Sequence, residues 1–99
     1  MKASDYLASF LADKGITHAF GLQGGAVVHL FDSLEKLAKT KVVYCHHEQT
    51  CSLAATAHSK YTGKIGCSIV TTGPACTNAM TGLLAAWQDS IPVTFISGQ

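Results

Sequence analysis

The sequence predicts an α/β fold in which helices flank a parallel sheet, and two observations support this. Four short apolar runs begin near residues 17, 42, 65 and 92. Successive runs lie roughly 25 residues apart, which leaves room for one crossover helix each, and helical periodicity fills the gaps. Repeated strand–helix–strand units give a doubly wound parallel sheet, as in Rossmann and flavodoxin-like folds.

The first three elements follow from periodicity and turn residues. Apolar residues at helical spacing predict a helix over residues 4–14, which Gly15 ends in a left-handed conformation. A short apolar run predicts a buried strand over residues 18–22. The 3.6-residue period returns at Val27 and predicts a second helix that ends near residue 38.

The middle of the chain continues the alternation. Residues 42–45 are β-branched and aromatic, which favours a second strand. The alanine-rich stretch at residues 53–57 predicts a closely packed helix that ends near Gly63. A third strand is expected over residues 65–70.

A fourth helix and a fourth strand follow. Pro74 suits the first turn of this helix, because the N–H that proline lacks is not needed there. One face of the helix is marked by Met80, Leu83, Leu84 and Trp87. The last strand is expected over residues 92–96. Since the chain stops at Gln99 with that sheet edge uncovered, we expect residues 1–99 to be one domain, truncated at its C-terminal end.

Composition excludes several classes of partner. The net charge is +1 with no basic stripe, so nucleic acid is not expected as a partner. No apolar run reaches the roughly 18 residues of a membrane span and no signal peptide is visible, so we expect a cytoplasmic protein without a membrane partner. The four cysteines form no CxxC pair and are expected to be free, mostly buried thiols.

Three breaks in the pattern fall where strands end, and ligands of open parallel sheets bind beyond the carboxyl ends of the strands. The breaks are Gln23-Gly24-Gly25, His46-His47-Glu48-Gln49, and Thr72-Gly73-Pro74 with Asn78. Each glycine alone fits ordinary turn chemistry. Their shared placement predicts a single site at this edge.

Glu48 is the strongest candidate for chemistry. A carboxylate at a helix N-terminus is often only a partner of the helix dipole. Here it follows an apolar strand at the rim of the sheet, where desolvation would raise its pKa and suit it to exchange a proton with a ligand nitrogen. The sequence therefore favours a general acid/base or proton-relay role.

Two other kinds of site are not expected. Residues 45–51 hold two cysteines, two histidines and Glu48, but the ligands do not have the spacing of H-E-x-x-H and a strand end separates them, so no metal site is predicted. Gln23 and Ala26 stand where a dinucleotide fingerprint counted from Gly21 needs glycine. A nucleotide-binding domain therefore remains only a weak alternative.

Seven motifs in order cover nearly the whole chain. They are Phe20-Gly21 with Gly24-Gly25-Ala26, Phe31-Asp32 with Leu34, His47-Glu48-Gln49, Thr62-Gly63-Lys64, Thr72-Gly73-Pro74 with Thr77-Asn78, Asp89-Ser90-Ile91-Pro92, and Ser97-Gly98-Gln99. Together they resemble the N-terminal pyrimidine-binding domain of thiamine-diphosphate enzymes, especially those of the acetolactate synthase type.

The resemblance implies a mechanism. Glu48 would hydrogen-bond N1′ of the aminopyrimidine and favour its imino tautomer, which removes the C2 proton of the thiazolium. The activated cofactor would then attack a 2-keto acid such as pyruvate, and CO₂ would leave. By the same resemblance, the pyrimidine would be bordered by Gly24, Gly25, Gly73, Pro74 and Asn78.

The resemblance also implies cofactors and partners beyond this chain. Related enzymes hold Mg²⁺ and the diphosphate with a Gly-Asp-Gly and Asn motif in a separate domain, which this sequence lacks. The complete enzyme would be a homodimer or tetramer, or a separate subunit would carry that domain, and the chain alone would be inactive. Ser90 falls where acetolactate synthases contact FAD, which adds FAD to the candidate cofactors. A non-catalytic assembly module, or a subunit of a split keto-acid decarboxylase, stays open as an alternative.

Overall fold

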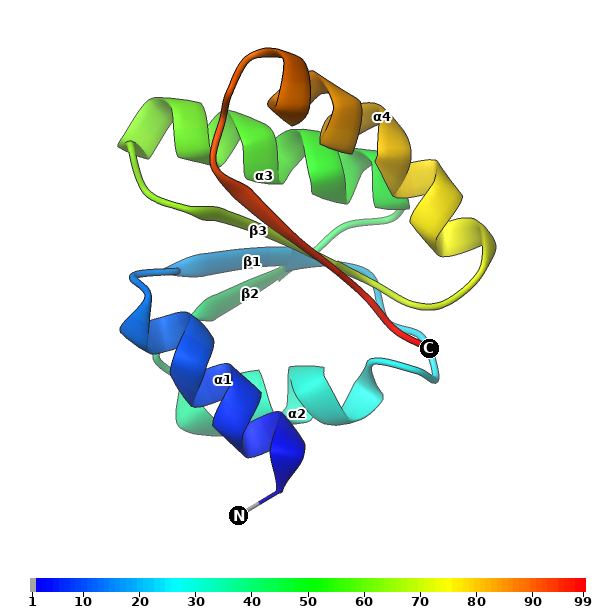
Figure 1. Ribbon diagram of the computed structural model, residues 1–99. Coiled ribbons are helices and arrows are strands. Elements are labelled where there is room, and N and C mark those ends of the chain that lie inside the picture. The colour runs from blue at the N-terminus through cyan, green and yellow to red at the C-terminus, as the bar shows by residue number, and fades with distance from the viewer. Residues whose placement is uncertain (1) are drawn as a thin grey trace.

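The computed structural model describes residues 2–99 and confirms the α/β fold. In chain order the elements are α1 (Ala3–Asp13), β1 (His18–Gly21), α2 (Val28–Leu37), β2 (Lys41–Tyr44), α3 (Glu48–Thr62), β3 (Gly66–Val70), α4 (Pro74–Gln88) and β4 (Val93–Ser97). The four strands form one parallel sheet in the order β2-β1-β3-β4. Figure 1 shows α1 and α2 on one face of the sheet and α3 and α4 on the other.

Each helix and strand predicted from the sequence is present, with small differences at the ends. The first helix ends as expected, at Gly15 with φ +83°. The second helix ends without a glycine: Ala38 takes the left-handed conformation at φ 57°, and its N–H donates to the Leu34 carbonyl at 3.0 Å. That conformation costs an alanine about 1–2 kcal/mol. The packing of α2 must therefore outweigh this cost.

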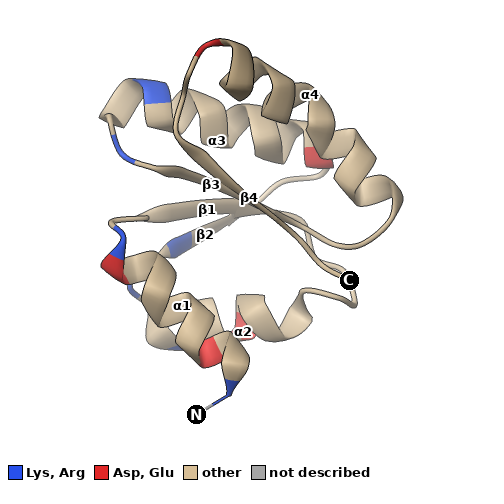
Figure 2. Cartoon of the chain, viewed as in Figure 1, with Lys and Arg blue, Asp and Glu red and all other residues tan. Residues whose placement is uncertain are grey.

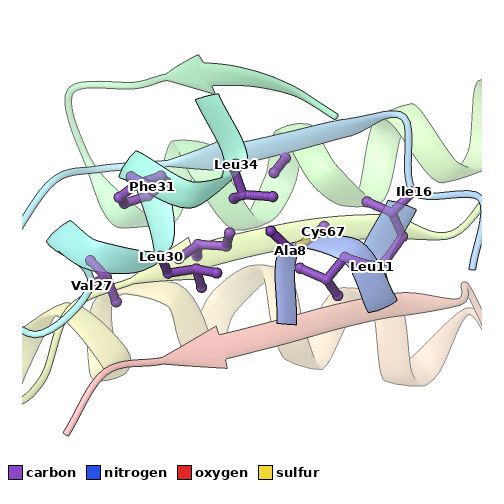
Figure 3. Close-up of a cluster of buried hydrophobic side chains, with 10 residues drawn as sticks. Ala8, Leu11, Ile16, Val27, Leu30, Phe31, Leu34 and Cys67 are labelled. Atoms are coloured by element: carbon purple, nitrogen blue, oxygen red, sulfur yellow. The ribbon is translucent and has the colours of Figure 1, made fainter. Parts of the chain in front are cut away.

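The main apolar core lies between the sheet and the layer of α1 and α2, as Figure 3 shows. Its buried members are Ala8, Leu11, Ile16, Ala19, Val27, Leu30, Phe31, Leu34, Cys67 and Ile69. Phe31 and Leu34 are fully buried, and burial of such a side chain contributes about 1.5–3 kcal/mol. Ser33 adds a polar link, because its hydroxyl donates to Asp5 Oδ1 at 2.7 Å and so joins α2 to α1.

The opposite layer is built from small residues, and the apolar face of α4 noted in the sequence is not its buried face. The residues that α4 buries are Ala75, Ala79, Gly82 and Ala86. The large apolar side chains that marked one face in the sequence are exposed instead, at 54% for Met80, 42% for Leu83, 54% for Leu84 and 80% for Trp87. The reason is the closeness of α3: a Cβ built on Gly82 would lie 2.2 Å from Ser52 Oγ. Only a small residue fits there.

The charged residues are spread unevenly over this frame. Figure 2 shows most of the lysine segments at the edge where the strands begin, on the left of the view. Lys14 precedes β1, Lys39 and Lys41 lie at the start of β2, and Lys64 precedes β3. The loops that follow β1, β2 and β3 carry no lysine or arginine. Among residues 2–99, no helix is both long and apolar enough to cross a membrane.

Candidate functional site

The three predicted breaks meet at the carboxyl edge of the sheet. Figure 1 shows the starts of α3 and α4, the loop between β1 and α2, and the C-terminus on the same side of the molecule. The loops are in contact: the Ala26 N–H donates to Thr71 Oγ1 at 3.3 Å, and a Cβ built on Gly24 would lie 2.3 Å from the Cβ of Thr71. The Gly98 N–H donates to the Val70 carbonyl at 2.9 Å. The edge is therefore a single joined surface.

Glu48 and Asn78, 30 residues apart in the sequence, form a direct hydrogen bond at this edge. The Asn78 amide Nδ2 donates to Glu48 Oε1 at 3.0 Å. Glu48 is the first residue of α3, and Asn78 lies in the first turns of α4. The contact brings two of the predicted site residues together.

The pKa of Glu48 moves in the direction opposite to the one expected from desolvation. The hydrogen bond from Asn78 is the main cause that lowers the pKa of Glu48 below its ordinary value. Burial acts in the other direction, but the carboxylate is only partly buried. The backbone of Glu48 and the nearby His47 also lower its pKa. Glu48 is therefore a charged carboxylate at neutral pH and an acceptor of hydrogen bonds.

His47 fixes the point at which α3 begins. Its backbone is extended, with φ −153° and ψ 144°, and its ring Nδ1 accepts a hydrogen bond from the Gln49 N–H at 3.0 Å. The first N–H groups of a helix have no partner within it, and a side-chain acceptor at this position supplies one. The cap places the Glu48 carboxylate at the positive end of the helix dipole.

Gly73 and Pro74 shape the start of α4. Gly73 is the N-cap residue, with φ +73° and ψ −132°, a backbone conformation that residues with a Cβ rarely adopt. Pro74 occupies the first turn, where its fixed φ suits the helix. Thr77 Oγ1 donates to the Pro74 carbonyl at 2.8 Å. This turn directs Asn78 toward Glu48.

The two glycines of the first loop differ in their surroundings. Gly24 lies so close to Thr71 that a side chain would collide with it. At Gly25, as at Gly73, a Cβ would meet nothing within 4 Å, so the backbone there borders open space. Close packing against Thr71 therefore explains why residue 24 is a glycine, whereas Gly25 faces open space.

Sequence reasoning missed Gly82 and Ser52, which set the distance between the helices that carry the site. Gly82 lies one turn after Asn78, and Ser52 one turn after Glu48, so their contact holds the two site residues together. The Thr56 hydroxyl also donates to the Gly82 carbonyl at 3.4 Å. The helical spacing of the small residues Ala75, Ala79, Gly82 and Ala86 was the sequence pattern that could have indicated this close helix packing.

No metal-binding group is found in the part of the chain that the structure describes. No cluster of three or more His, Cys, Asp or Glu side chains there could hold an ion. The four cysteines are free; Cys51 and Cys67 are buried, Cys45 is partly buried and Cys76 is exposed. A cavity of about 450 Å³ beside Lys39 and Lys41 lies at the amino edge, away from Glu48.

Ser90 is also far from this edge. It has a left-handed backbone, with φ 57°, in the turn between the end of α4 and the start of β4. Because β4 runs parallel to β3, its first residues lie at the opposite edge of the sheet from Glu48. Ser90 therefore does not belong to the cluster around Glu48 and Asn78.

Known protein sequences match the whole length of this chain. The family model described as the thiamine pyrophosphate enzyme, N-terminal TPP binding domain, matches residues 1–99. The acetolactate synthase large subunits of Haemophilus influenzae and of Buchnera aphidicola from Acyrthosiphon pisum are 38% and 40% identical over 99 residues. The Escherichia coli isozyme 2 large subunit is 38% identical over the same length. In each case all of this chain is covered, but only 17%, 17% and 18% of the relative.

Proposed function

The chain belongs to the thiamine pyrophosphate enzymes, as their N-terminal TPP-binding domain, and from this we propose that it binds the aminopyrimidine of thiamine diphosphate and relays a proton through Glu48. The observation that carries the proposal is the hydrogen bond between Asn78 and Glu48 at the carboxyl edge. It holds a charged carboxylate where ligands of parallel sheets bind.

The surroundings of Glu48 fit a flat, nitrogen-containing ring. Asn78 is the one side chain among residues 2–99 that donates to the carboxylate, so acceptor capacity remains for a ligand N–H. Gly25 and Gly73 offer backbone without a Cβ beside open space, which a ring can approach closely. The Glu48 carboxylate and the accessible backbone at Gly25 and Gly73 together support binding of the pyrimidine ring at this edge.

The proton relay depends on how the pKa of Glu48 responds to a ligand. Asn78 keeps Glu48 charged, and a ring that covers the carboxylate removes water from it, which raises its pKa. Glu48 can then share a proton with ring nitrogen N1′ while Asn78 holds its other side in place. When bound, thiamine diphosphate supplies the nucleophilic carbon and the electron sink for decarboxylation of a 2-keto acid.

Among residues 2–99, the structure shows no partner for the diphosphate end of the cofactor. The loops that follow β1, β2 and β3 contain no lysine or arginine, and no cluster among residues 2–99 could hold Mg²⁺. We therefore propose that Mg²⁺ and the diphosphate are held by another domain or subunit, in a homodimer, a tetramer or a split enzyme. The named relatives further suggest acetolactate synthase-like chemistry on a 2-keto acid such as pyruvate. FAD remains a candidate, outside the site at Glu48.

A second candidate function is that of a non-catalytic assembly module. The observation that favours it is the exposed apolar face of α4, with Met80, Leu84 and Trp87 each more than half exposed, at 54%, 54% and 80%. Such a face is suited to contact with another protein surface. Binding of the pyrimidine by wild type but not by a Glu48 variant distinguishes the two functions.

The first experiment compares thiamine with thiamine diphosphate as ligands of the chain, by NMR titration. The two are expected to bind with affinities within about threefold of each other, because the diphosphate meets no cation here. Glu48→Gln is expected to weaken both by about tenfold or more, the worth of a hydrogen bond to a charged group. Asp13→Asn, which removes an exposed charge at the opposite edge, is the control. A much tighter diphosphate complex, or an unchanged Glu48→Gln affinity, would contradict the proposal.

A second measurement tests the relay itself. In the chain completed by the domain that holds the diphosphate, exchange of the C2 proton of the bound ligand with deuterium, followed by NMR at saturation, is expected to slow at least about 100-fold in Glu48→Gln. The amide keeps the size of the side chain but cannot carry the proton. An exchange rate equal to that of wild type would remove Glu48 from the mechanism and leave it a binding role.

A further inference from the structure

A cavity of about 150 Å³ lies between α4 and the strands β3 and β4, on the face of the sheet that α3 and α4 cover (Figure 1). The proposed pyrimidine site uses none of the residues that line this cavity. Most of the lining is apolar and comes from Val70, Ala79, Leu83, Phe95 and Ile96. A cavity of this volume with apolar walls is large enough to take up a molecule the size of benzene.

One buried hydroxyl, that of Ser68 in β3, belongs to the wall of this cavity. Side chains alternate between the two faces of a strand, and the neighbours Cys67 and Ile69 belong to the core on the side of α1 and α2. Ser68 therefore points the other way, toward α4 and the cavity. It is 1% exposed, and no residue among 2–99 gives its Oγ a hydrogen-bond partner. Because buried hydroxyls are normally hydrogen-bonded, Ser68 has unused capacity to donate and to accept.

The other polar groups on the wall restrict what this cavity can hold. The Ser97 hydroxyl already donates to the Thr71 carbonyl at 3.2 Å, and the Cys76 thiol is only a weak donor. A well-held buried water needs about two to four partners, so water would be held poorly here and a ligand could displace it at little cost. None of the described residues that line the cavity is charged, so an ionised ligand would lose its hydration without compensation.

We propose that this cavity binds a small neutral molecule with an apolar body and one hydroxyl or carbonyl group, which forms a hydrogen bond with Ser68. The serine hydroxyl both donates and accepts, so it suits either group. Cys76 and Leu83 are exposed as well as lining the cavity, which opens it to solvent at α4. A 2-keto acid is excluded because its carboxylate would meet no cation here. The site is therefore separate from the one at Glu48, and neither proposal depends on the other.

NMR titration of the chain with phenol tests the cavity, with toluene and benzoate as the apolar and the charged comparison. Phenol and toluene are expected to shift the methyl signals of Val70 and Leu83 until they saturate. The methyl signals of Leu34, which is buried on the other face of the sheet, should not move. Benzoate should bind at least about tenfold more weakly than phenol. Shifts that do not saturate, equal binding of benzoate, or larger shifts at the exposed Leu84 than at Val70 would overturn the proposal.

Two serine variants test the hydrogen bond. Ser68→Ala removes the bonding group and should weaken phenol binding by about fivefold, while toluene binding stays within about twofold of wild type. Ser97→Ala is the matched control, because the Ser97 hydroxyl already has a partner, and should change neither affinity. Unchanged phenol binding in Ser68→Ala, or equal losses in both variants, would reject the assignment of Ser68.

The stability of Ser68→Ala gives a readout that needs no ligand. The urea midpoint of this variant should not fall below that of wild type, because the hydroxyl that it removes has no partner in the folded chain. Saturating phenol should raise the midpoint of wild type, since a ligand that binds the folded chain stabilises it. A lower midpoint for Ser68→Ala would show that the hydroxyl is already bonded, and would overturn the proposal.

Discussion

Asn78 is the main cause of the lowered pKa of Glu48, through a hydrogen bond of 3.0 Å from Nδ2 to Oε1. We expect Asn78→Ala to raise the pKa of Glu48 toward its ordinary 4.5, and Asn78→Asp to raise it further because the new carboxylate repels the old one. NMR titration of the Glu48 carboxyl carbon measures both. Asp5, whose pKa is lowered by Ser33, is the internal control and should not change.

The same bond makes the stability of the chain depend on pH. The pKa of Glu48 is lower in the folded chain than its ordinary 4.5, so the contact stabilises the fold fully above about that pH. The contribution is lost as the pH falls through the folded pKa. The difference in free energy of unfolding between wild type and Asn78→Ala should therefore shrink on acidification. If this difference in free energy of unfolding stayed constant from pH 7 downward, the stabilisation by Asn78 would not depend on the charge of Glu48.

Gly73 and Gly25 form a natural pair for testing backbone strain. Neither has a neighbour where a Cβ would lie, but only Gly73 has a left-handed φ, +73°. Gly73→Ala is expected to lower the free energy of unfolding by about 1–3 kcal/mol, measured by urea denaturation, because φ +73° with ψ −132° is a sparsely populated conformation for alanine. Gly25→Ala should change it by less than about 0.5 kcal/mol. Equal losses in the two variants would show that φ is not the cause.

At the scale of elements, the packing of α3 against α4 sets the geometry of the site. Gly82→Ala places a Cβ 2.2 Å from Ser52 Oγ and 2.6 Å from the Ser52 carbonyl carbon, so the helices must separate. Overpacking of this kind costs about 1–3 kcal/mol. We expect the variant to be destabilised by that amount and to show a Glu48 pKa nearer its ordinary value. Thr81→Ala, at an exposed neighbouring position, is the control for both measurements. A destabilised variant with an unchanged Glu48 pKa would separate the two effects.

Periodicity was enough to predict the helices and strands, but not which face of α4 is buried. A hydrophobicity pattern assigns Leu84 and Trp87 to the core, because it weighs the size of apolar side chains. The structure buries Ala79 and Gly82 instead, since α3 lies too close for anything larger. That distance belongs to the tertiary structure, and no local pattern contains it.

The candidate site was predictable in position and not in detail. Parallel strands end at one edge, so the turns before Glu48 and Asn78 were expected at the same edge of the sheet. The hydrogen bond between these residues, and with it the lowered pKa of Glu48, depends on the helix spacing at Gly82. The expectation of a raised pKa for Glu48 was wrong because it considered only burial. The hydrogen bond from the Asn78 amide, which lowers the pKa, could not be predicted from the sequence.

At the scale of the whole molecule, the outer edge of β4 leaves backbone groups unpaired and the outer face of α4 leaves apolar side chains exposed. Within residues 2–99, β4 pairs with β3 alone, so its other edge carries unpaired backbone groups. Beside it, α4 exposes Met80, Leu84 and Trp87, and Trp87 and Leu83 border a groove against Phe95. Exposed sheet edges and apolar patches of this kind favour association. The proposed function needs a second domain or subunit for the diphosphate, and this surface is a physical reason to expect contact with one.

We therefore expect the chain alone to self-associate through the exposed face of α4, as measured by sedimentation velocity over a range of concentrations. The double variant Leu84→Gln with Trp87→Gln removes apolar surface worth about 1.5–3 kcal/mol per side chain and should weaken association at least tenfold. Tyr61→Gln is the control, because Tyr61 is 93% exposed at the far end of α3. Circular dichroism should show the same helix content in all variants, since none of these side chains is buried. Association that persists in the double variant would assign it to the free edge of β4. The remaining test would then be Val93→Pro, because Pro92 accepts from the Gly66 N–H, so that the N–H of the next residue, Val93, faces the free edge.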